Sequence, residues 1–325
     1  MSTFSSPDSC GRANQHPAVG LIAGPTASGK SDLALRLAQS LMAAGKPAVI
    51  INADSAQLYA DLPILSAAPP PQDLAAVPHL LYGAWDGADS CSAADWAARA
   101  REAIDKAHAE GATPILVGGT GLYMRTLLDG IAPVPPIDPA IREAVRAMPV
   151  AQAHEELSRL DPPKATALHP SDTTRVHRAL EVVLSTGQSI THWQQALVGG
   201  IGHRITLAPF ILLPDRAWLY ERCNRRFGLM VEQGALEEVA RLLERGLNPQ
   251  LPVMRAIGVE ALAAHLRGDW TLEEAMAQGA QATRTYAKRQ YTWFRNQPPP
   301  EWQRYTAIPP KDFDFSSHFV SLFHD

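Results

Sequence analysis

Phosphate binding is indicated by the segment GPTASGKS at residues 24–31, where Gly24 is followed after four residues by Gly29, Lys30 and Ser31. Glycines allow a loop to turn its N–H groups toward phosphate oxygens, the lysine adds a positive charge, and the serine hydroxyl can hold Mg²⁺. The positive end of a following helix adds to this attraction. The spacing suits a hydrolysed nucleotide as well as a diphosphate carried by another molecule, so it predicts a phosphate site and leaves the ligand open.

A carboxylate that could act in the same site is Asp54, within INADSAQLY at residues 51–59. An aspartate after an apolar run can cap a helix, and it can also be a catalytic or metal-linked group. Because the phosphate loop precedes it, we favour the catalytic interpretation over the cap. The segment VGGTGLYMRTLLDG at 117–130 adds glycines, which allow the backbone to approach a ligand closely.

A parallel sheet is needed to bring these residues together. Apolar runs at 17–24, 47–52 and 113–119 predict strands, and the patterns at 31–44 and 92–111 predict helices between them. This alternation is typical of a parallel sheet covered by helices on both faces. Gly24, Asp54 and Gly119 each fall at the carboxyl end of a predicted strand, which is where ligands bind in such folds.

The fold class predicted is α/β, with a P-loop-containing parallel sheet core flanked by helices and an inserted all-helical lobe. A proline-rich stretch at 129–145 interrupts the alternation, and strand character returns only at 204–215. A helical pattern then closes the core at 271–295. We therefore expect a discontinuous core formed by residues 17–137 and 206–310, a helical insertion at 138–205 and a flexible tail at 1–16.

The composition excludes several classes of protein. The chain has 325 residues, 46% of them hydrophobic, which is enough for a large core. Its three cysteines, Cys10, Cys91 and Cys223, form no C-x-x-C pair, which argues against a disulfide framework or a zinc finger and fits a cytoplasmic protein. No apolar run reaches the roughly eighteen residues of a membrane span, and residues 1–16 lack a secretion signal. The net charge of −4 argues against bulk attraction to nucleic acid.

Positive charge occurs in local groups instead. Arg175 and Arg178 lie three residues apart, so they share a helix face that is either solvated or in contact with RNA. A second stripe contains Arg284, Lys288 and Arg295, beside Trp293 and Phe294, which we expect in the core. We interpret Arg222, Arg225 and Arg226 as surface charge. His169 and His177 have no partner at ligand spacing, so they are interpreted as polar filler.

The motifs, in this order, resemble the tRNA dimethylallyltransferase (isopentenyltransferase) family, which transfers a dimethylallyl group to N6 of adenosine 37 in tRNA. Three further segments are similar to that family's signatures, namely HPSDTTRVHRALEV at 169–182, MRAIGVEAL at 254–262 and TRTYAKRQYTWFR at 283–295. The resemblance covers residues 18–296. It implies that the product is N6-isopentenyladenosine in tRNAs reading codons that begin with U, with release of diphosphate.

The resemblance also implies roles for particular residues. Asp54 would be the general base, and Arg255 would clamp the diphosphate of dimethylallyl diphosphate from the side opposite the loop. The diphosphate-binding loop would consist of Gly24, Pro25, Thr26, Ala27, Ser28, Gly29, Lys30 and Ser31, with Mg²⁺ at Ser31. The residues that would contact the tRNA anticodon stem-loop are Asp54, Ser55, Ala56, Gln57, Thr120, Arg142, Thr174, Arg175, Val176, His177 and Arg178. We expect a monomer with no obligate protein partner.

The chain departs from the family's pattern at a few positions. ILSAAP at 64–69 stands where many members have IGTAKP, so that Leu65 and Ala68 replace a glycine and a lysine, and Val259 replaces a common tyrosine. Two other functions use the same loop. A small-molecule or nucleoside kinase would use Asp54 as the base on a hydroxyl but gives no role to the helical lobe. A non-catalytic RNA-binding protein would hold a backbone phosphate in the loop, where Asp54 would repel it.

Overall fold

The computed structural model describes residues 16–324, which form two compact units. The first unit runs to Leu127 and resumes at Gly202, and the second spans Leu128–Ile201. The insertion therefore begins and ends upstream of the expected 138 and 205, because Ile131 and Val198 pair as an antiparallel bridge and bring the two connecting segments together. Residues 1–15, which make up most of the expected tail and include Cys10, lie outside the described residues.

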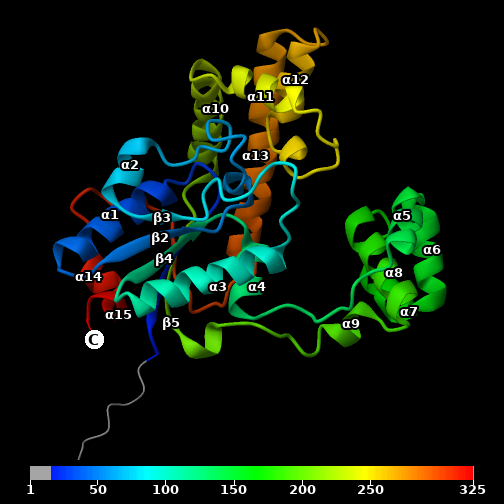
Figure 1. The fold of residues 1–325 in the computed structure, drawn as a ribbon, viewed down its shortest axis with the longest axis horizontal. Coiled ribbons are helices and arrows are strands. Elements are labelled where there is room, and N and C mark those ends of the chain that lie inside the picture. Colours follow the sequence, from blue (N-terminus) through cyan, green and yellow to red (C-terminus); the bar gives the residue numbers. More distant parts are fainter. Residues whose placement is uncertain (1–15, 325) are drawn as a thin grey trace, which may run out of the picture. The chain divides into compact units, whose positions relative to one another are not determined.

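A six-stranded sheet in the order β3-β2-β4-β1-β5-β6 forms the first unit, and all its pairs are parallel (Figure 1). The strands predicted at 17–24, 47–52 and 113–119 are confirmed, whereas two strands of two residues were too short to show a pattern. The strands are β1 Ala18–Ala23, β2 Ala48–Asn52, β3 His79–Leu80, β4 Thr113–Gly118, β5 Thr206–Leu212 and β6 Arg304–Tyr305.

The central strands end at one level. Ala23 of β1 pairs with Gly118 of β4 and with Ile211 of β5, and Asn52 of β2 pairs with Val117 of β4. Because all these strands run in the same direction, the residues that follow them meet at one edge of the sheet. The phosphate loop, Asp54 and the Gly119 turn therefore lie together, as the sequence predicted.

Helices cover both faces of the sheet because its central strands are buried on both sides. On one face, α1 (Lys30–Ala43) packs on Ile22, Ile50 and Ile115 in a cluster that also contains the C-terminal helices α14 (Phe315–His318) and α15 (Val320–Phe323). α3 (Ala93–Ala109) contacts β2 and β4, and its Trp96 indole donates to the Asn52 carbonyl at 2.9 Å. The ring of Trp96 stacks on Tyr123 of α4 (Gly121–Leu128) at 4.7 Å.

Several helices from the C-terminal half of the first unit extend beyond the sheet edge that carries the site (Figure 1). α10 (Arg216–Glu232) and α13 (Leu272–Asn296) pack side by side (Figure 1), and α13 begins at a capping box formed by Thr271 and Glu274. Within residues 16–324, no helix combines the length and the apolar character that a membrane span requires. The other elements of this unit are η1 Ser55–Leu58, α2 Pro71–Ala76, η2 Gly202–Arg204, α11 Ala235–Glu244, η3 Val253–Arg255 and α12 Val259–Leu266.

The second unit is helical, as expected. Its buried core contains Val145, Leu157, Val176 and Leu180. A buried carboxylate, Glu181, accepts a hydrogen bond from Arg146 at 3.1 Å. The helices are α5 Pro139–Ala147, α6 Val150–Leu160, α7 Pro162–Ala167, α8 Thr173–Thr186 and α9 Ile190–Trp193.

Candidate active site

The phosphate loop leaves β1 and enters α1 through a backbone that depends on glycine. A Cβ built on Gly24 would lie 2.6 Å from the carbonyl oxygen of Leu212, and Gly29 has a φ of 93°. Gly29 is the N-cap of α1 and supplies no side chain to satisfy the first N–H groups of the helix. These groups point out of the helix end, where the helix dipole favours an anion. The local structure therefore fits a bound phosphate.

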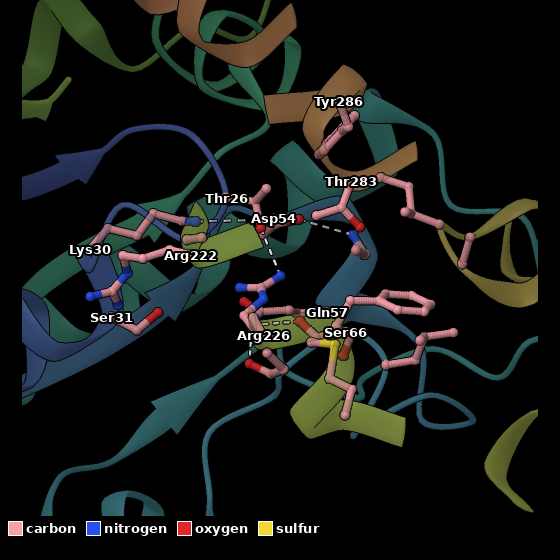
Figure 2. A pocket seen from close by; sticks show the side chains of 18 of the residues that line it. Thr26, Lys30, Ser31, Asp54, Gln57, Ser66, Arg222, Arg226, Thr283 and Tyr286 are labelled. Atoms are coloured by element: carbon pink, nitrogen blue, oxygen red, sulfur yellow. Dashed lines mark hydrogen bonds and ion pairs between the residues drawn. The ribbon is translucent and has the colours of Figure 1, made fainter. Parts of the chain in front are cut away.

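Two cations flank this loop. Lys30 Nζ lies 3.8 Å from Asp54 Oδ2, and Arg226 of α10 donates to the Thr26 hydroxyl at 2.7 Å (Figure 2). Burial lowers the pKa of Lys30, and the nearby Asp54 carboxylate counteracts part of that effect. Burial also lowers the pKa of Arg226. A buried lysine and a half-buried arginine facing one buried carboxylate leave an excess of positive charge, which an anionic ligand would stabilise.

The interpretation of Arg226 as surface charge is thus wrong. Arg226 is separated from Thr26 by 200 positions in the sequence, so only the packing of α10 against the loop reveals the contact. Its neighbour Arg225 is exposed, as expected. Arg222 also lines the cavity next to the loop, and its guanidinium lies 4.6 Å from the ring of Trp218.

The sequence context of Asp54 allows a helix cap or a catalytic carboxylate, and its position in the structure is compatible with both. Its Oδ1 accepts the Ala56 N–H at 3.1 Å and caps η1, while its Oδ2 faces Lys30. The backbone N–H of Asp54 donates to Asn52 Oδ1 at 2.8 Å, which fixes the residue at the end of β2. The cap therefore orients the carboxylate and leaves one oxygen directed toward the cations of the loop. That oxygen could accept a proton from a bound substrate.

A cavity of about 260 Å³ extends from the phosphate loop. Its lining includes the charged side chains of Lys30, Asp54 and Arg226 and a set of apolar side chains. Such a site suits a small molecule with a charged head and a short hydrocarbon tail. The apolar part of the lining consists of Leu62, Leu65, Phe227, Met230 and Ile257, so Leu65, one of the departures from the family pattern, contributes to it. Val259 is buried in α12.

A second cavity, of about 320 Å³, adjoins the first and shares Ala56, Ala256, Ile257 and Tyr286 with it. Arg255 lines this second cavity and not the first, together with Ser55, Tyr59, Cys91 and Arg289. The structure therefore does not bring Arg255 to the diphosphate loop, where Arg226 lies instead. A clamp at Arg255 stays a prediction.

Ser55, which lines the second cavity, is joined to Thr120 by hydrogen bonds. The Ser55 N–H donates to the Thr120 hydroxyl oxygen at 2.9 Å, and the Thr120 hydroxyl donates to Ser55 Oγ at 3.2 Å. The Tyr286 hydroxyl interacts with both side chains, and burial raises the pKa of Tyr286 to about 12. These three groups remain neutral near pH 7, so they can offer hydrogen bonds to a polar ligand beside Asp54.

Buried side chains hold the loops in place, and two of them, Gln290 and Glu238, were not singled out in the sequence. Gln290 accepts the Thr26 N–H at 2.7 Å and donates to the Gly119 carbonyl at 2.8 Å, so it links the phosphate loop to the turn after β4. Glu238 accepts the N–H groups of Ile64 and Leu65, each at 2.8 Å. Gln57 donates to the Ala67 carbonyl at 2.6 Å and therefore supports the same loop. Gln290 lies within the segment 283–295, which is similar to a family signature, whereas no motif in the sequence marks Glu238.

The site fits a metal ion that arrives with its substrate. The described residues contain no group of three His, Cys, Asp or Glu side chains arranged to hold a metal. Mg²⁺ is commonly bound through one or two protein oxygens together with substrate phosphates and water. Ser31 is exposed where it lines the cavity beside Lys30, so its hydroxyl could supply one such oxygen.

The remaining predicted RNA-contact residues lie in the helical second unit. Arg175 and Arg178 share α8 as expected, and each has an acidic neighbour, Asp172 at 2.6 Å and Glu181 at 3.7 Å respectively. Arg142 and Thr174 are exposed. The prediction of an RNA contact at Val176 is wrong, because its side chain is fully buried in the core of the unit and is not accessible to RNA. His177 Nε2 is buried and has no hydrogen-bond partner among the described residues.

Comparison with known sequences gives one consistent result. The family model described as IPP transferase matches residues 57–297. A tRNA dimethylallyltransferase from Erythrobacter litoralis is 60% identical over 309 residues, which make up 95% of this chain and 96% of the relative. Another, from Novosphingobium aromaticivorans, is 62% identical over 260 residues, covering 80% of this chain and 92% of the relative.

Solved structures share the fold as well as the sequence. The full-length tRNA isopentenylpyrophosphate transferase from Bacillus halodurans matches with a TM-score of 0.63 and 33% identity, covering 95% of each chain. A eukaryotic dimethylallyltransferase acting on tRNA matches with a TM-score of 0.73 and 28% identity, covering 86% of this chain and 70% of that chain. With a phosphate loop, a carboxylate and two adjoining cavities in place, this chain belongs to the IPP transferase family, that of the tRNA dimethylallyltransferases.

Proposed function

We propose that the protein transfers a dimethylallyl group from dimethylallyl diphosphate to N6 of adenosine 37 in tRNAs that read codons beginning with U, and releases diphosphate. The observation that carries this proposal is the position of Asp54 in the first cavity, with its cap partner Ala56 on the wall of both cavities. A base at that point can serve a donor in one cavity and a nucleobase in the other.

The donor would place its diphosphate at the loop and its hydrocarbon against the apolar part of the lining of the first cavity. Lys30, Arg226 and the N–H groups at the start of α1 would neutralise the negative charge that grows on the leaving oxygen as the carbon–oxygen bond breaks. Mg²⁺ held by Ser31 and the diphosphate would supply further positive charge. No ATP is needed, because the phosphates form the leaving group.

The acceptor requires a base. The exocyclic nitrogen of adenine is a weak nucleophile, since its lone pair is delocalised into the ring. Asp54 Oδ2 would take one proton from this nitrogen as the new carbon–nitrogen bond forms, and a positioned base contributes about 10²–10⁴ in rate. Lys30 lies 3.8 Å from this oxygen, on the side of the diphosphate loop.

The nucleobase would enter through the second cavity. A base in an anticodon loop must leave its stack, which costs a few kcal/mol and less than in a duplex. Ser55, Thr120 and Tyr286 provide hydrogen-bonding groups near Asp54, and Arg255 and Arg289 provide positive charge. This position supports a contact of Arg255 with RNA more than the diphosphate clamp that the family resemblance implies.

The partners that we propose are tRNA and dimethylallyl diphosphate alone. We also propose that the protein acts as a monomer, which gel filtration with light scattering would test. We expect the enzyme to act in the cytoplasm, because the charged donor and the tRNA are both found there and the cysteine pattern needs no oxidising compartment.

A transfer assay tests the proposal. The purified protein is incubated with labelled dimethylallyl diphosphate, Mg²⁺ and an anticodon stem-loop containing A36 and A37, without ATP. We expect label in this RNA and none in a matched stem-loop with guanosine at position 37. Asp54→Asn should retain binding of the diphosphate and lose transfer. Absence of labelled RNA, or a requirement for ATP with a nucleoside acceptor, would refute the proposal and favour a kinase.

A further inference from the structure

We propose that Phe227 sets the length of the hydrocarbon chain that the enzyme accepts, by closing the apolar part of the first cavity to donors longer than the dimethylallyl group. This inference rests on the proposed function, because it assigns that cavity to the donor. The phosphate loop cannot distinguish donors by the length of their hydrocarbon chain, since it would contact the same diphosphate group on every isoprenoid donor.

Phe227 lies next to the group that would bind the head of the donor. It follows Arg226 in α10, and Arg226 bonds to Thr26 in the phosphate loop. Phe227 lines the same cavity, and only 3% of its surface is exposed. Because both residues stand on one turn of a long helix, the distance between the charged group and the aromatic wall is fixed. A site of fixed depth can exclude ligands that are longer than that depth.

The ring of Phe227 is packed against backbone on the side away from the cavity. A Cβ built on Gly279 of α13 would lie 2.0 Å from Phe227 Cζ, and one built on Gly258 would lie 2.8 Å from Phe227 Cε2. Neither glycine lines the cavity, so the ring separates the cavity from both. Gly258 is the N-cap of α12 with a φ of 95°, and Gly279 lies inside α13. The ring therefore has no space into which it could withdraw.

The neighbouring apolar side chains do not impose the same limit. Met230 is unbranched and can change rotamer to fit a ligand. Leu65 belongs to a loop, although Glu238 holds its N–H group at 2.8 Å. Phe227 is the bulky group that is backed by two helices, so a longer chain directed at it would meet a rigid wall. An added isoprene unit is close in size to the phenyl ring, so removal of the ring is a matched test.

The experiment compares dimethylallyl and geranyl diphosphate as donors for the same anticodon stem-loop. For the unaltered protein we expect kcat/KM to favour dimethylallyl diphosphate by tenfold or more, about the discrimination that one hydrophobic contact provides. In Phe227→Ala the ratio should shift toward geranyl diphosphate by about tenfold or more, with a smaller shift in Phe227→Leu. Phe294→Leu is the matched control, because Phe294 is buried in α13 and does not line the cavity. Its ratio should remain that of the unaltered protein.

Two results would overturn the inference. One is an unchanged donor ratio in Phe227→Leu or Phe227→Ala when thermal unfolding shows that the variant is folded. The other is efficient transfer of the geranyl group by the unaltered protein, a measurement that does not depend on any variant folding. If dimethylallyl transfer occurs and the ratio does not move, only the role of Phe227 fails. If neither donor labels RNA, the proposed function itself fails.

Discussion

The positive charge at the phosphate loop comes from Lys30 within the loop and from Arg226 on α10. Arg226 adds what a lysine cannot, because its planar guanidinium can bond to Thr26 through one nitrogen and present others to a phosphate. Asp54 lies opposite both and is oriented by its own cap bond to Ala56. At the scale of single residues, the site is an excess of positive charge beside one carboxylate.

Loss of Arg226 should therefore impair the chemical step. We expect Arg226→Ala to lower kcat/KM for dimethylallyl diphosphate by about 10²-fold, since one preorganised donor to a developing charge is worth that much. Arg226→Lys should recover part of the loss, because it restores charge without the planar geometry. Steady-state kinetics at saturating RNA measure the effect. Arg225→Ala, which removes an exposed arginine at the next position, should leave the rate unchanged, and an equal loss in both variants would contradict the assignment.

The state of Lys30 predicts a pH dependence. Burial lowers the pKa of Lys30, and only the protonated amine attracts the diphosphate. Donor affinity should therefore be fully present below this pKa and decrease as the pH rises through it. Because the charge of Asp54 raises the pKa of Lys30, Asp54→Asn should move the decrease to lower pH. Calorimetric titration of dimethylallyl diphosphate across pH gives the midpoint, and a midpoint that stays in place or rises would show that another group controls binding.

At the scale of secondary structure elements, the cavities depend on side chains that bind neighbouring backbone. Glu238 of α11 holds the N–H groups of Ile64 and Leu65, and the residues of this loop form part of the apolar wall. Gln290 of α13 connects Thr26 to Gly119. Burial raises the pKa of Glu238, and the two N–H donors oppose that shift. The helices beyond the sheet thus determine the shape of a site whose charges lie on the sheet edge and on α10.

Replacement of Glu238 should affect donor binding more than chemistry. Glu238→Gln leaves one acceptor oxygen for two N–H groups, so a buried donor loses its partner at a cost of about 1–3 kcal/mol. We expect a higher KM for dimethylallyl diphosphate, a kcat close to that of the unaltered enzyme and a lower Tm. Glu237→Gln changes the same charge at the exposed preceding position and should alter none of these values. A lower kcat at unchanged KM would instead place Glu238 in the chemistry.

The long strands and the phosphate loop could be predicted because their signals are local. Apolar runs of several residues mark β1, β2 and β4, and the spacing of Gly24, Gly29 and Lys30 is a motif in itself. The contacts of Arg226, Glu238 and Gln290 could not be predicted, because their partners lie 200, 174 and 264 positions away respectively. A charged residue on an amphipathic helix has the same sequence pattern whether it faces solvent or a cavity.

At the scale of the whole molecule, the catalytic core is completed only after the chain returns from the helical unit. β5 pairs with β1 along the register Ala18↔Thr206, and the carbonyl of Leu212 at its end lies where any side chain on Gly24 would be placed. Arg226 and Gln290 also follow the insertion in the sequence. The phosphate loop therefore reaches its functional form only when both segments of the core have folded together, so truncation after the helical unit would remove the contacts of Arg226 and Gln290 with Thr26.

The exposed arginines of the helical unit differ in whether they have a carboxylate nearby. Arg175 and Arg178 already lie near Asp172 and Glu181, so an RNA phosphate must compete with those carboxylates. Arg142 on α5 is exposed and, within residues 16–324, has no acidic partner at ion-pair distance. A free guanidinium is the better candidate for a phosphate contact, because no existing bond is lost. Arg142 is therefore the residue of this unit at which the contribution to RNA binding can be measured most directly.

We expect Arg142→Ala to weaken binding of the tRNA at low salt and to have little effect at high salt. Loss of one phosphate contact should reduce the slope of log K against log salt by about 0.7–0.9, and affinity for dimethylallyl diphosphate should not change. Arg159→Ala is the matched control, because it removes the same charge from an exposed position of the same unit where Arg159 is paired with Glu156. Fluorescence anisotropy of labelled tRNA over a range of KCl concentrations measures both slopes. If the two variants show the same slope as the unaltered protein, Arg142 belongs to the solvated surface, and RNA contact in this unit falls to Arg175 and Arg178.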